Sequence, residues 1–222
     1  MFRKVVTTLT NYPLLRKQSK PFPDFSFWTD QDKNNLKDLH ETFNILQGYG
    51  LAAPQIGILK RAIVVNLQAL GVSSHENAVI MVNPILESWG PEQRNEEACF
   101  SVPHVSARVT RPSNCRVSYT TIEGENHEIE LEGFPAACLQ HEIDHLDGKL
   151  YLDRVGSVYK SMLLKKSKKT QKKITEAKRL AKEEFDREHN DLFQTSDSKK
   201  TTHSRKRKPK ARKKRPKRSK KK

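Results

Sequence analysis

The segment QHEIDHLDG, residues 140–148, restricts the possible folds of this chain more than any other part of its 222 residues. His141 and His145 are four residues apart, so in a helix both imidazoles lie on one face and can share a metal ion. Pro135 suits the first turn of this helix, and Gly148 suits its end. Its apolar residues predict burial, and buried histidines without partners are costly, which disfavours the alternative of two surface histidines. We therefore expect a buried metal-binding helix.

Two further residues are candidates for the same site. Glu142 follows the first histidine, and a carboxylate there can take a proton from water and later deliver it to a leaving nitrogen. A catalytic metal ion needs a third protein ligand. Cys99 is the strongest candidate, because it lies between two predicted strands and shortly before Pro103, which we expect to end their pairing. Cys115 and Cys138 are interpreted as buried core thiols, the commonest fate of a free cysteine.

Hydrophobic periodicity predicts an α+β fold in which antiparallel β-sheets pack around the central HExxH helix. Thr29 or Asp30 is expected to cap an amphipathic helix that Gly48 ends. A folded β arm is expected at residues 5–10 and a loop at residues 48–57. The β-rich segments are residues 61–67, 78–89, 105–111, 115–122 and 127–131, with a hairpin turn at residues 123–126.

The net charge of +16 belongs to the C-terminus rather than to the fold. Residues 198–222 contain sixteen Lys or Arg and no acidic residue, which leaves 26 basic residues (42 minus 16) against 26 acidic ones elsewhere. Residues from 157 to about 192 lack Gly and Pro and predict a long charged helix, while the low hydrophobicity after residue 194 predicts disorder. The expected organisation is a catalytic domain at 1–156, a charged C-terminal helix at 157–194 and a disordered polybasic tail at 195–222.

The cellular location is predicted from what the sequence lacks. The chain has three cysteines, no apolar run of about 18 residues and no secretory signal, which favours a cytoplasmic protein without a transmembrane segment. The first 23 residues are basic and free of acids, as in an organelle transit peptide, but Pro13 and the β-branched residues 5–10 favour a folded arm. We expect a monomer.

Three blocks of sequence together resemble one family, the peptide deformylases. They are GYGLAAPQ at 48–55, EACFS at 97–101 and QHEIDH at 140–145, in the order and at the spacing of that family's signature motifs. Residues 5–21 resemble its N-terminal strand, and GKLYLDR at 148–154 resembles its segment after the metal helix. The resemblance implies hydrolysis of the formyl group from the N-terminal formyl-methionine of nascent polypeptides, with release of formate.

The resemblance also implies a role for each matching residue. Cys99, His141 and His145 would bind one divalent metal ion, and Glu142 would handle protons. Gln55 and the backbone N–H of Phe100 would donate to the developing oxyanion and so stabilise the transition state more than the ground state. The remaining positions are Gly50, Ala98, Phe100, Phe134, Ala137 and Cys138 for substrate binding, and Glu97 with Arg111 as an ion pair that supports the metal loop.

The resemblance implies Fe²⁺ as the physiological ion. Residue types alone do not decide it, because one thiolate with two imidazoles also accepts Co²⁺, Ni²⁺ or Zn²⁺, and zinc binds more tightly than iron.

Three residues depart from the family pattern. Ala98 stands where the family has glycine, which is damaging only if the loop needs φ above zero. Phe100 replaces leucine and is expected to narrow or reshape the methionine pocket. Ser106 replaces an arginine found in some members, which is expected to weaken contacts with the peptide beyond methionine. None of the three removes a metal ligand or the acid/base.

The polybasic tail is expected to bind ribosomal RNA. Residues 205–218 can displace counterions from phosphates but contain no aromatic residue for stacking on bases. Attachment near the nascent chain would raise the effective concentration of enzyme and substrate. The residues assigned to RNA contact are Arg205, Lys206, Arg207, Lys208, Arg212, Lys213, Lys214 and Arg215. A solubilising tail, a membrane-surface contact and a localisation-like string are the alternatives.

Two other functions stay open at this point. A zincin-type peptidase shares HExxH but takes its third ligand downstream, where His189 and His203 lie. An inactive deformylase-like protein that binds RNA or the ribosome is the second, because Ala98 and Phe100 depart from the family pattern.

Overall fold

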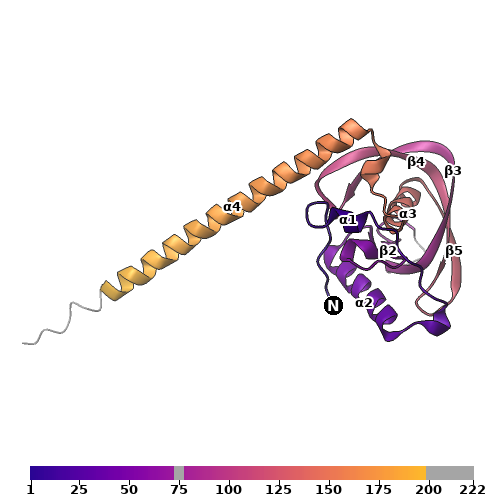
Figure 1. Ribbon diagram of the computed structural model, residues 1–222, viewed down its shortest axis with the longest axis horizontal. Coiled ribbons are helices and arrows are strands. Elements are labelled where there is room, and N and C mark those ends of the chain that lie inside the picture. Colours follow the sequence, from indigo (N-terminus) through magenta and orange to yellow (C-terminus); the bar gives the residue numbers. More distant parts are fainter. Residues whose placement is uncertain (73–77, 199–222) are drawn as a thin grey trace, which may run out of the picture. The chain divides into compact units, whose positions relative to one another are not determined.

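The computed structural model describes residues 1–72 and 78–198, with side chains as far as Arg187. By its internal contacts the chain divides into two compact units, Met1–Lys173 and Ile174–Lys222. The helices are α1 (Tyr12–Leu15), α2 (Asp30–Leu46), α3 (Gly133–Leu146) and α4 (Ser157–Ser198), with 3-10 helices η1 (Phe25–Phe27), η2 (Ala53–Ile56) and η3 (Tyr151–Arg154) (Figure 1). The strands are β1 (Gly50–Ala52), β2 (Ala62–Asn66), β3 (Ala78–Cys99), β4 (Val102–Thr120) and β5 (Asn126–Glu132).

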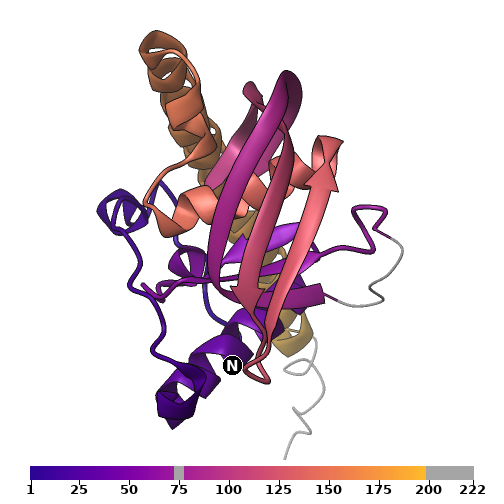
Figure 2. The same cartoon turned by 90° about the vertical axis from the view of Figure 1, so that its right-hand side faces the viewer.

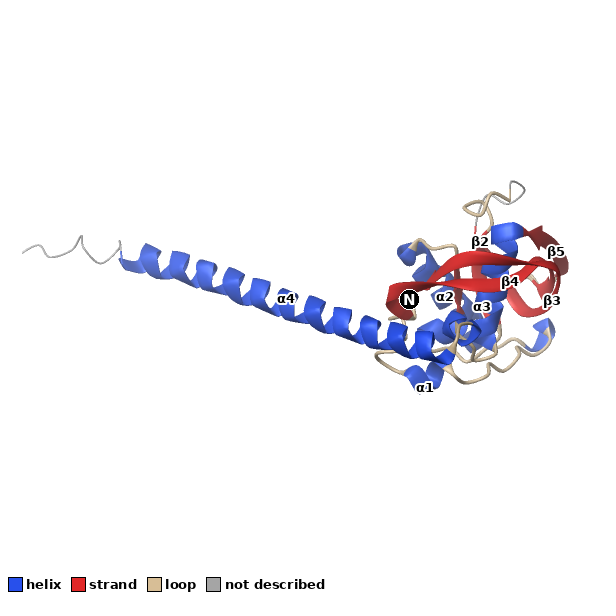
Figure 3. Ribbon diagram, turned by 90° about the horizontal axis from the view of Figure 1, so that it is seen from above, coloured by secondary structure: helices blue, strands red, loops and turns tan. Residues whose placement is uncertain are grey.

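The five strands form one antiparallel sheet in the order β1-β2-β3-β4-β5. Figure 3 shows the strands in red and the helices in blue. The expected combination of helices with antiparallel strands is confirmed. The predicted breaks within the strands were wrong, because β3 continues to Cys99 and β4 joins the segments expected at 105–111 and 115–122. Gly90 and Pro112 lie where the register of β3 and β4 shifts, so these residues are accommodated at a bulge instead of ending the strands.

The helix with the HExxH motif lies against the sheet and inside its curve (Figures 1 and 2). Leu139, Ile143 and Leu146 of α3 belong to a buried cluster that includes Ile63 of β2 and Val117 of β4. Because this apolar side of α3 is fixed in the core, the polar side is held in a constant position relative to the strands.

The helix α2 begins as predicted, but the residue that terminates it lies one position earlier than expected. Thr29 caps it, with a reciprocal pair of hydrogen bonds between Thr29 and Asp32. It ends at Leu46, and Gln47, rather than Gly48, adopts the left-handed conformation with φ 53°.

Two segments near the N-terminus differ from expectation. Residues 5–10 do not form a strand, but Val6 N–H donates to the carbonyl of Gln55 at 2.7 Å and Thr8 N–H to that of Ser101 at 2.8 Å. Only isolated backbone bonds are formed, too few for a ladder. Residues 48–57, expected as a loop, contain β1 and η2. The N-terminal segment thus holds the backbone of Gln55 and of Ser101 through these two hydrogen bonds.

The first turns of α4 pack on the body of the first unit. Leu163 and Ser167 are buried, and Leu163 joins a cluster with Val105 of β4 and Leu152 of η3. Residues 195–198, predicted as the start of the disordered tail, instead continue α4, and residues 199–222 of the predicted tail lie outside the described residues. The domain boundaries predicted at 156 and 194 stay predictions. Within the described ranges, no helix is both long enough and apolar enough to cross a membrane.

Candidate active site and metal centre

One cysteine and two histidines meet between β3 and α3. The ligand atoms of Cys99, His141 and His145 all lie within 4.8 Å of one another, and Cys99 Sγ is 3.3 Å from His145 Nε2. His145 Nδ1 has no hydrogen-bond partner among the described residues, whereas His141 Nδ1 is hydrogen-bonded to the carboxylate of Glu97. One thiol and two imidazoles suit Fe²⁺, Zn²⁺ and related ions, so the donor set fits a divalent transition metal.

The tip of the β3–β4 hairpin presents the cysteine. Cys99 pairs with Val102, so it lies at the end of a long strand rather than in an isolated loop. We predicted that Pro103 ends the pairing of the two strands, and this prediction was wrong. The register shifts between the pairs Ala98–Ser106 and Cys99–Val102, so the proline lies in a bulge where its missing N–H costs no hydrogen bond between the strands. Within the described backbone, Ala98 does not have a positive φ, so its methyl group does not strain the chain.

A buried ion-pair network supports the centre from behind. His141 Nδ1 lies 2.7 Å from Glu97 Oε2, and Arg111 donates to both oxygens of Glu97 at 2.6 and 2.9 Å. Burial pushes the pKa of Glu97 upward, but the hydrogen bonds from Arg111 and His141 outweigh it and hold the pKa below its usual value. Glu97 therefore stays ionised and orients the His141 ring.

Sequence reasoning missed two members of this network. Arg111 also donates to Asp144 Oδ2 at 2.7 Å, and Arg154 donates to both oxygens of Asp144 at 2.7 Å each. Asp144 lies within HEIDH, three residues after His141, so a second acid on this buried helix was the available signal. The guanidinium of Arg111 is fully buried and lies between two carboxylates.

The carboxylate of Glu142 is buried, and one of its two oxygens lacks a hydrogen-bond donor among the described residues. Its Oε2 accepts no hydrogen bond from any described residue. Burial, with a further contribution from the charge of Glu97, raises the pKa of Glu142 to about 7. Gly50 allows this arrangement, because a Cβ at position 50 would lie 2.6 Å from Glu142 Cγ and 2.7 Å from Glu142 Oε1.

Gln55 reaches the cysteine from η2. Its Oε1 accepts from Ala52 N–H at 2.7 Å, which directs its amide nitrogen toward Cys99 Sγ and Ser101 Oγ, each at 3.3 Å. Ser101 was not singled out from the sequence. Both amide hydrogens of Gln55 have acceptors in this structure, so donation to a bound molecule requires one of them to exchange its partner.

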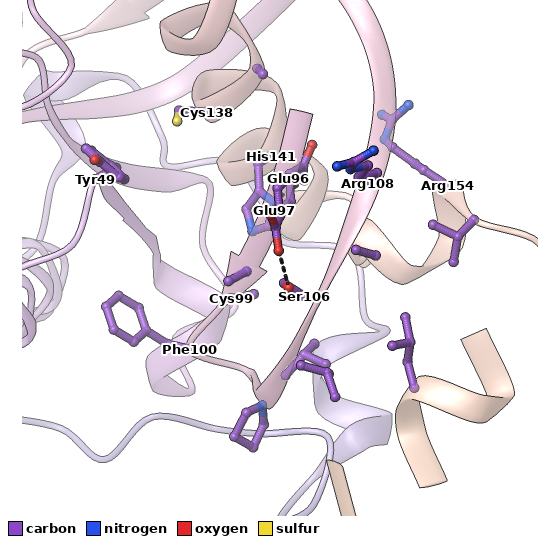
Figure 4. A pocket seen from close by; sticks show the side chains of 18 of the residues that line it. Tyr49, Glu96, Glu97, Cys99, Phe100, Ser106, Arg108, Cys138, His141 and Arg154 are labelled. Atoms are coloured by element: carbon purple, nitrogen blue, oxygen red, sulfur yellow. Dashed lines mark hydrogen bonds and ion pairs between the residues drawn. The ribbon is translucent and has the colours of Figure 1, made fainter. Parts of the chain in front are cut away.

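An open cavity of about 1520 Å³ adjoins the cluster. Its apolar part is lined by Phe134, Ala137 and Cys138 of α3, and Tyr49 packs edge-to-face on Phe134 with ring centroids 5.3 Å apart. Figure 4 shows Tyr49 and Phe100 on one side of the metal-ligand cluster and Arg108 with Arg154 on the other. Burial raises the pKa of the Cys138 thiol to about 12, so this thiol is an apolar wall rather than a nucleophile.

Phe100 lies over Gly48. A Cβ at position 48 would be 2.7 Å from the Phe100 ring, so the larger side chain at position 100 depends on the glycine that faces it. The ring is 36% exposed and lines the cavity.

A sheet packed on a helix that bears two histidines and a buried carboxylate, completed by a cysteine, places the chain in the class of HExxH hydrolases. A family model described as polypeptide deformylase matches residues 3–161, and the chain belongs to that family. It is 38% identical over 163 residues to the peptide deformylase of Bartonella tribocorum, which covers 72% of this chain and 89% of that protein. The peptide deformylase of Wolinella succinogenes is 38% identical over 162 residues, 72% of this chain and 94% of that protein.

Solved structures agree with this assignment. The crystal structure of a peptide deformylase from Legionella pneumophila has a TM-score of 0.68 at 32% identity and covers 79% of this chain and 98% of its own. A peptide deformylase from Acinetobacter baumannii, bound to Met-Ala-Ser, has a TM-score of 0.61 at 32% identity and covers 70% and 99%. The chain is therefore an enzyme with peptide deformylase activity, and neither the zincin nor the inactive alternative is favoured. The side chains of His189 and His203 and all the residues assigned to RNA contact lie outside the described part.

Proposed function

We propose that this enzyme removes the formyl group from the N-terminal formyl-methionine of nascent polypeptides and depends on a divalent metal ion held by Cys99, His141 and His145. The observation that carries the proposal is the cluster of three ligand atoms within 4.8 Å of one another, next to the buried carboxylate of Glu142. The Acinetobacter relative is bound to Met-Ala-Ser, which supports a substrate that begins with methionine.

The metal ion proposed for the cell is Fe²⁺, as the family resemblance implies. Co²⁺, Ni²⁺ and Zn²⁺ suit the same donors, so the ion in purified protein depends on its preparation. When bound, the ion supplies Lewis acidity, which polarises the formyl carbonyl and acidifies water.

The protein's own groups account for proton transfer and charge stabilisation. A Glu142 carboxyl whose pKa lies near neutrality suits a group that takes a proton from water and returns it to the departing amine. Gln55 is placed to exchange Cys99 Sγ or Ser101 Oγ for the formyl oxygen, together with the N–H of Phe100. In this scheme the methionine side chain enters the apolar part of the cavity beside Phe134.

Turnover of two substrates tests the reaction. Iron-loaded protein should release formate from formyl-Met-Ala-Ser and leave casein intact. Cleavage of casein without release of formate would refute the proposal in favour of an endopeptidase.

Metal content tests the ligand assignment separately. Cys99→Ala should lose the bound metal, because two imidazoles alone hold it weakly, whereas Cys115→Ala, at a thiol in the core, should keep it. Equal metal content in Cys99→Ala and the unchanged protein, measured by mass spectrometry, would exclude Cys99 as a ligand.

We also propose that the basic C-terminus binds ribosomal RNA. Residues 165–173 hold six lysines on α4, and the sixteen basic residues of 198–222 follow in the sequence. This charge favours phosphate binding with little sequence preference. Ribosome pelleting of the full chain should be strong at low salt, weaker at high salt, and much weaker for a chain truncated at Thr195, which of the C-terminal basic residues keeps only those of α4. Equal pelleting of both proteins would contradict the tether.

A further inference from the structure

Tyr151 of η3 is one of the largest fully buried side chains among the described residues, and the proposed reaction gives it no role. Its ring stacks on the imidazole of His141, with the ring centroids 5.9 Å apart and the ring planes 22° apart. This separation lies in the range that aromatic rings adopt when they attract each other through offset stacking. An aromatic ring therefore lies against one of the proposed metal ligands.

The hydroxyl of Tyr151 reaches a different element. It donates to the carbonyl of Val105 on β4 at 3.0 Å. Val105 follows shortly after Val102, which pairs with Cys99 at the tip of the β3–β4 hairpin. Tyr151 and Val105 share a buried cluster against which Cys99 packs. Because a buried hydroxyl without a partner is costly, this bond fixes the distance between Tyr151 and the hairpin that presents the cysteine.

Two contacts of different direction hold the His141 ring. Glu97 Oε2 lies 2.7 Å from His141 Nδ1 at the edge of the ring, and a single hydrogen bond at one atom leaves the ring free to tilt about that atom. Tyr151 lies against the face of the ring and limits this tilt. The direction of the Nε2 lone pair, on which binding of a metal ion depends, is therefore set by both contacts together.

We infer that Tyr151 is a positioning residue of the metal centre: its ring fixes the tilt of His141, and its hydroxyl holds the hairpin with Cys99 in place relative to α3. The inference rests on the proposed function, because it takes His141 and Cys99 as metal ligands. Tyr151 does not line the cavity, so it acts on the reaction only through these ligands. Its loss should therefore change metal retention and ligand geometry, and change the KM for substrate little.

Full-length protein loaded with Co²⁺ tests the two contacts, because the visible absorption of Co²⁺ depends on the arrangement of its ligands. Tyr151→Leu removes both contacts, so Co²⁺ should pass to excess EDTA at least about tenfold faster and the visible spectrum should change, as expected when a residue that orients a metal ligand is lost. Tyr151→Phe keeps the ring and loses only the hydroxyl. Its visible spectrum should stay the same, and its release of Co²⁺ should be about threefold faster.

Tyr119 of β4, a second buried tyrosine, provides the matched control. Its ring lies near His127 rather than near a metal ligand, with the ring centroids 6.0 Å apart. Tyr119→Leu should lower the thermal midpoint, as loss of core packing does, but both Tyr119→Leu and Tyr119→Phe should leave the spectrum and the release of Co²⁺ unchanged. Thermal unfolding of all four variants sets a temperature for the metal exchange at which each of them is folded.

Release of Co²⁺ from Tyr151→Leu no faster than from Tyr119→Leu would make Tyr151 an ordinary core side chain and overturn the inference. If Tyr151→Leu does not fold, the two Phe variants decide, and equal release from both would overturn it as well. The KM of Tyr151→Phe for formyl-Met-Ala-Ser should stay within about twofold of the unchanged protein, and a larger change would instead mean a role in substrate binding.

The unchanged protein separates this inference from the proposed function. If it binds no Co²⁺, the metal site and the inference are contradicted together. If it holds Co²⁺ and releases it at the same rate as all four variants, the inference is overturned and the proposed function stands.

Discussion

At the scale of single residues, Gly50 and Glu142 act as one unit. The missing side chain at position 50 is the space that the carboxylate occupies, since any Cβ there would lie within 2.8 Å of three Glu142 atoms. The fit explains why a glycine stands in the motif at 48–55 although its backbone is an ordinary strand.

Gly50→Ala should therefore displace Glu142 and lower kcat on formyl-Met-Ala-Ser by at least about tenfold, with a smaller effect on stability. Gly156→Ala is the matched control, because a Cβ at position 156 meets no atom within 4 Å. Steady-state kinetics and thermal unfolding of both variants check this. An unchanged kcat in Gly50→Ala would show that the exact place of the carboxylate does not matter.

Glu142→Gln tests the proton transfer itself. The amide has the same shape but neither accepts a proton from water nor returns one, so kcat should fall about 10²- to 10⁴-fold while the metal content stays the same. Kinetics and metal analysis of one preparation measure both. A fall in kcat that merely follows a loss of metal would instead assign Glu142 a structural role.

At the scale of elements, Arg111 joins the β3–β4 hairpin to α3. It is the cation between Glu97 on β3 and Asp144 on α3, and Arg154 extends the network to η3. Burial pushes the pKa of Asp144 upward, but Arg154 and Arg111 outweigh it and keep the pKa below its usual value. The metal ligands from two elements thus share one support.

Arg111→Met should destabilise the fold by about 3–5 kcal/mol, because it leaves two buried carboxylates without their common cation. Urea unfolding measures this loss. Arg116→Met, which removes an exposed arginine from ion pairs with Glu128 and Glu130, should change stability little. Similar losses in both variants would mean that the burial of Arg111 is not the decisive factor.

Asp153 ties η3 to α4 and makes stability depend on pH. Burial raises its pKa, but the Leu150 N–H, Lys160 and Arg16 outweigh that effect, so the pKa lies below its ordinary value in the folded chain. A lowered folded-state pKa stabilises the fold above the unfolded value, near 3.9, and this stabilisation is lost as the pH falls through the folded pKa.

Asp153→Asn should therefore be less stable than the unchanged chain at neutral pH by on the order of 1 kcal/mol. The difference should shrink as the pH falls below about 4, because the unchanged chain then loses the same charge. Urea midpoints at several pH values check this. A difference that stays constant down to pH 2 would rule out the carboxylate charge as its cause.

At the scale of the whole molecule, the hydrophobic core and the excess of basic residues belong to different segments of the sequence. The three buried clusters contain no residue after Leu164, and the described side chains after residue 174 are exposed. A chain ending at Lys173 should keep its thermal midpoint within a few degrees and its kcat/KM for formyl-Met-Ala-Ser within about twofold. A large drop in the midpoint would mean that the second unit contributes to the stability of the first.

The sequence alone determined the candidate chemistry, because chemistry depends on residue types at fixed spacing. The spacing in HEIDH placed both histidines on one face of a helix, and the position of Cys99 between two predicted strands made it the strongest candidate for the third ligand. Gln55 was assigned only through a motif that resembles that of a family. The helices α2, α3 and α4 followed from local periodicity and caps, which act within a few residues. Strand limits did not follow from the sequence. Pro103 was expected to end the pairing and residues 112–114 were expected to separate two strands, whereas the pairing of β3 with β4 accommodates both places at register shifts.

Only the tertiary structure decided which distant residues meet. Asp144 and Arg154 around Arg111, Phe100 over Gly48, Ser101 beside Gln55, and Leu163 of α4 in one cluster with Val105 of β4 are contacts across long stretches of sequence. No local pattern records such contacts, because they depend on how the sheet curves around α3. The spacing of two histidines predicted the metal centre, whereas the residues that surround the centre depend on the tertiary structure.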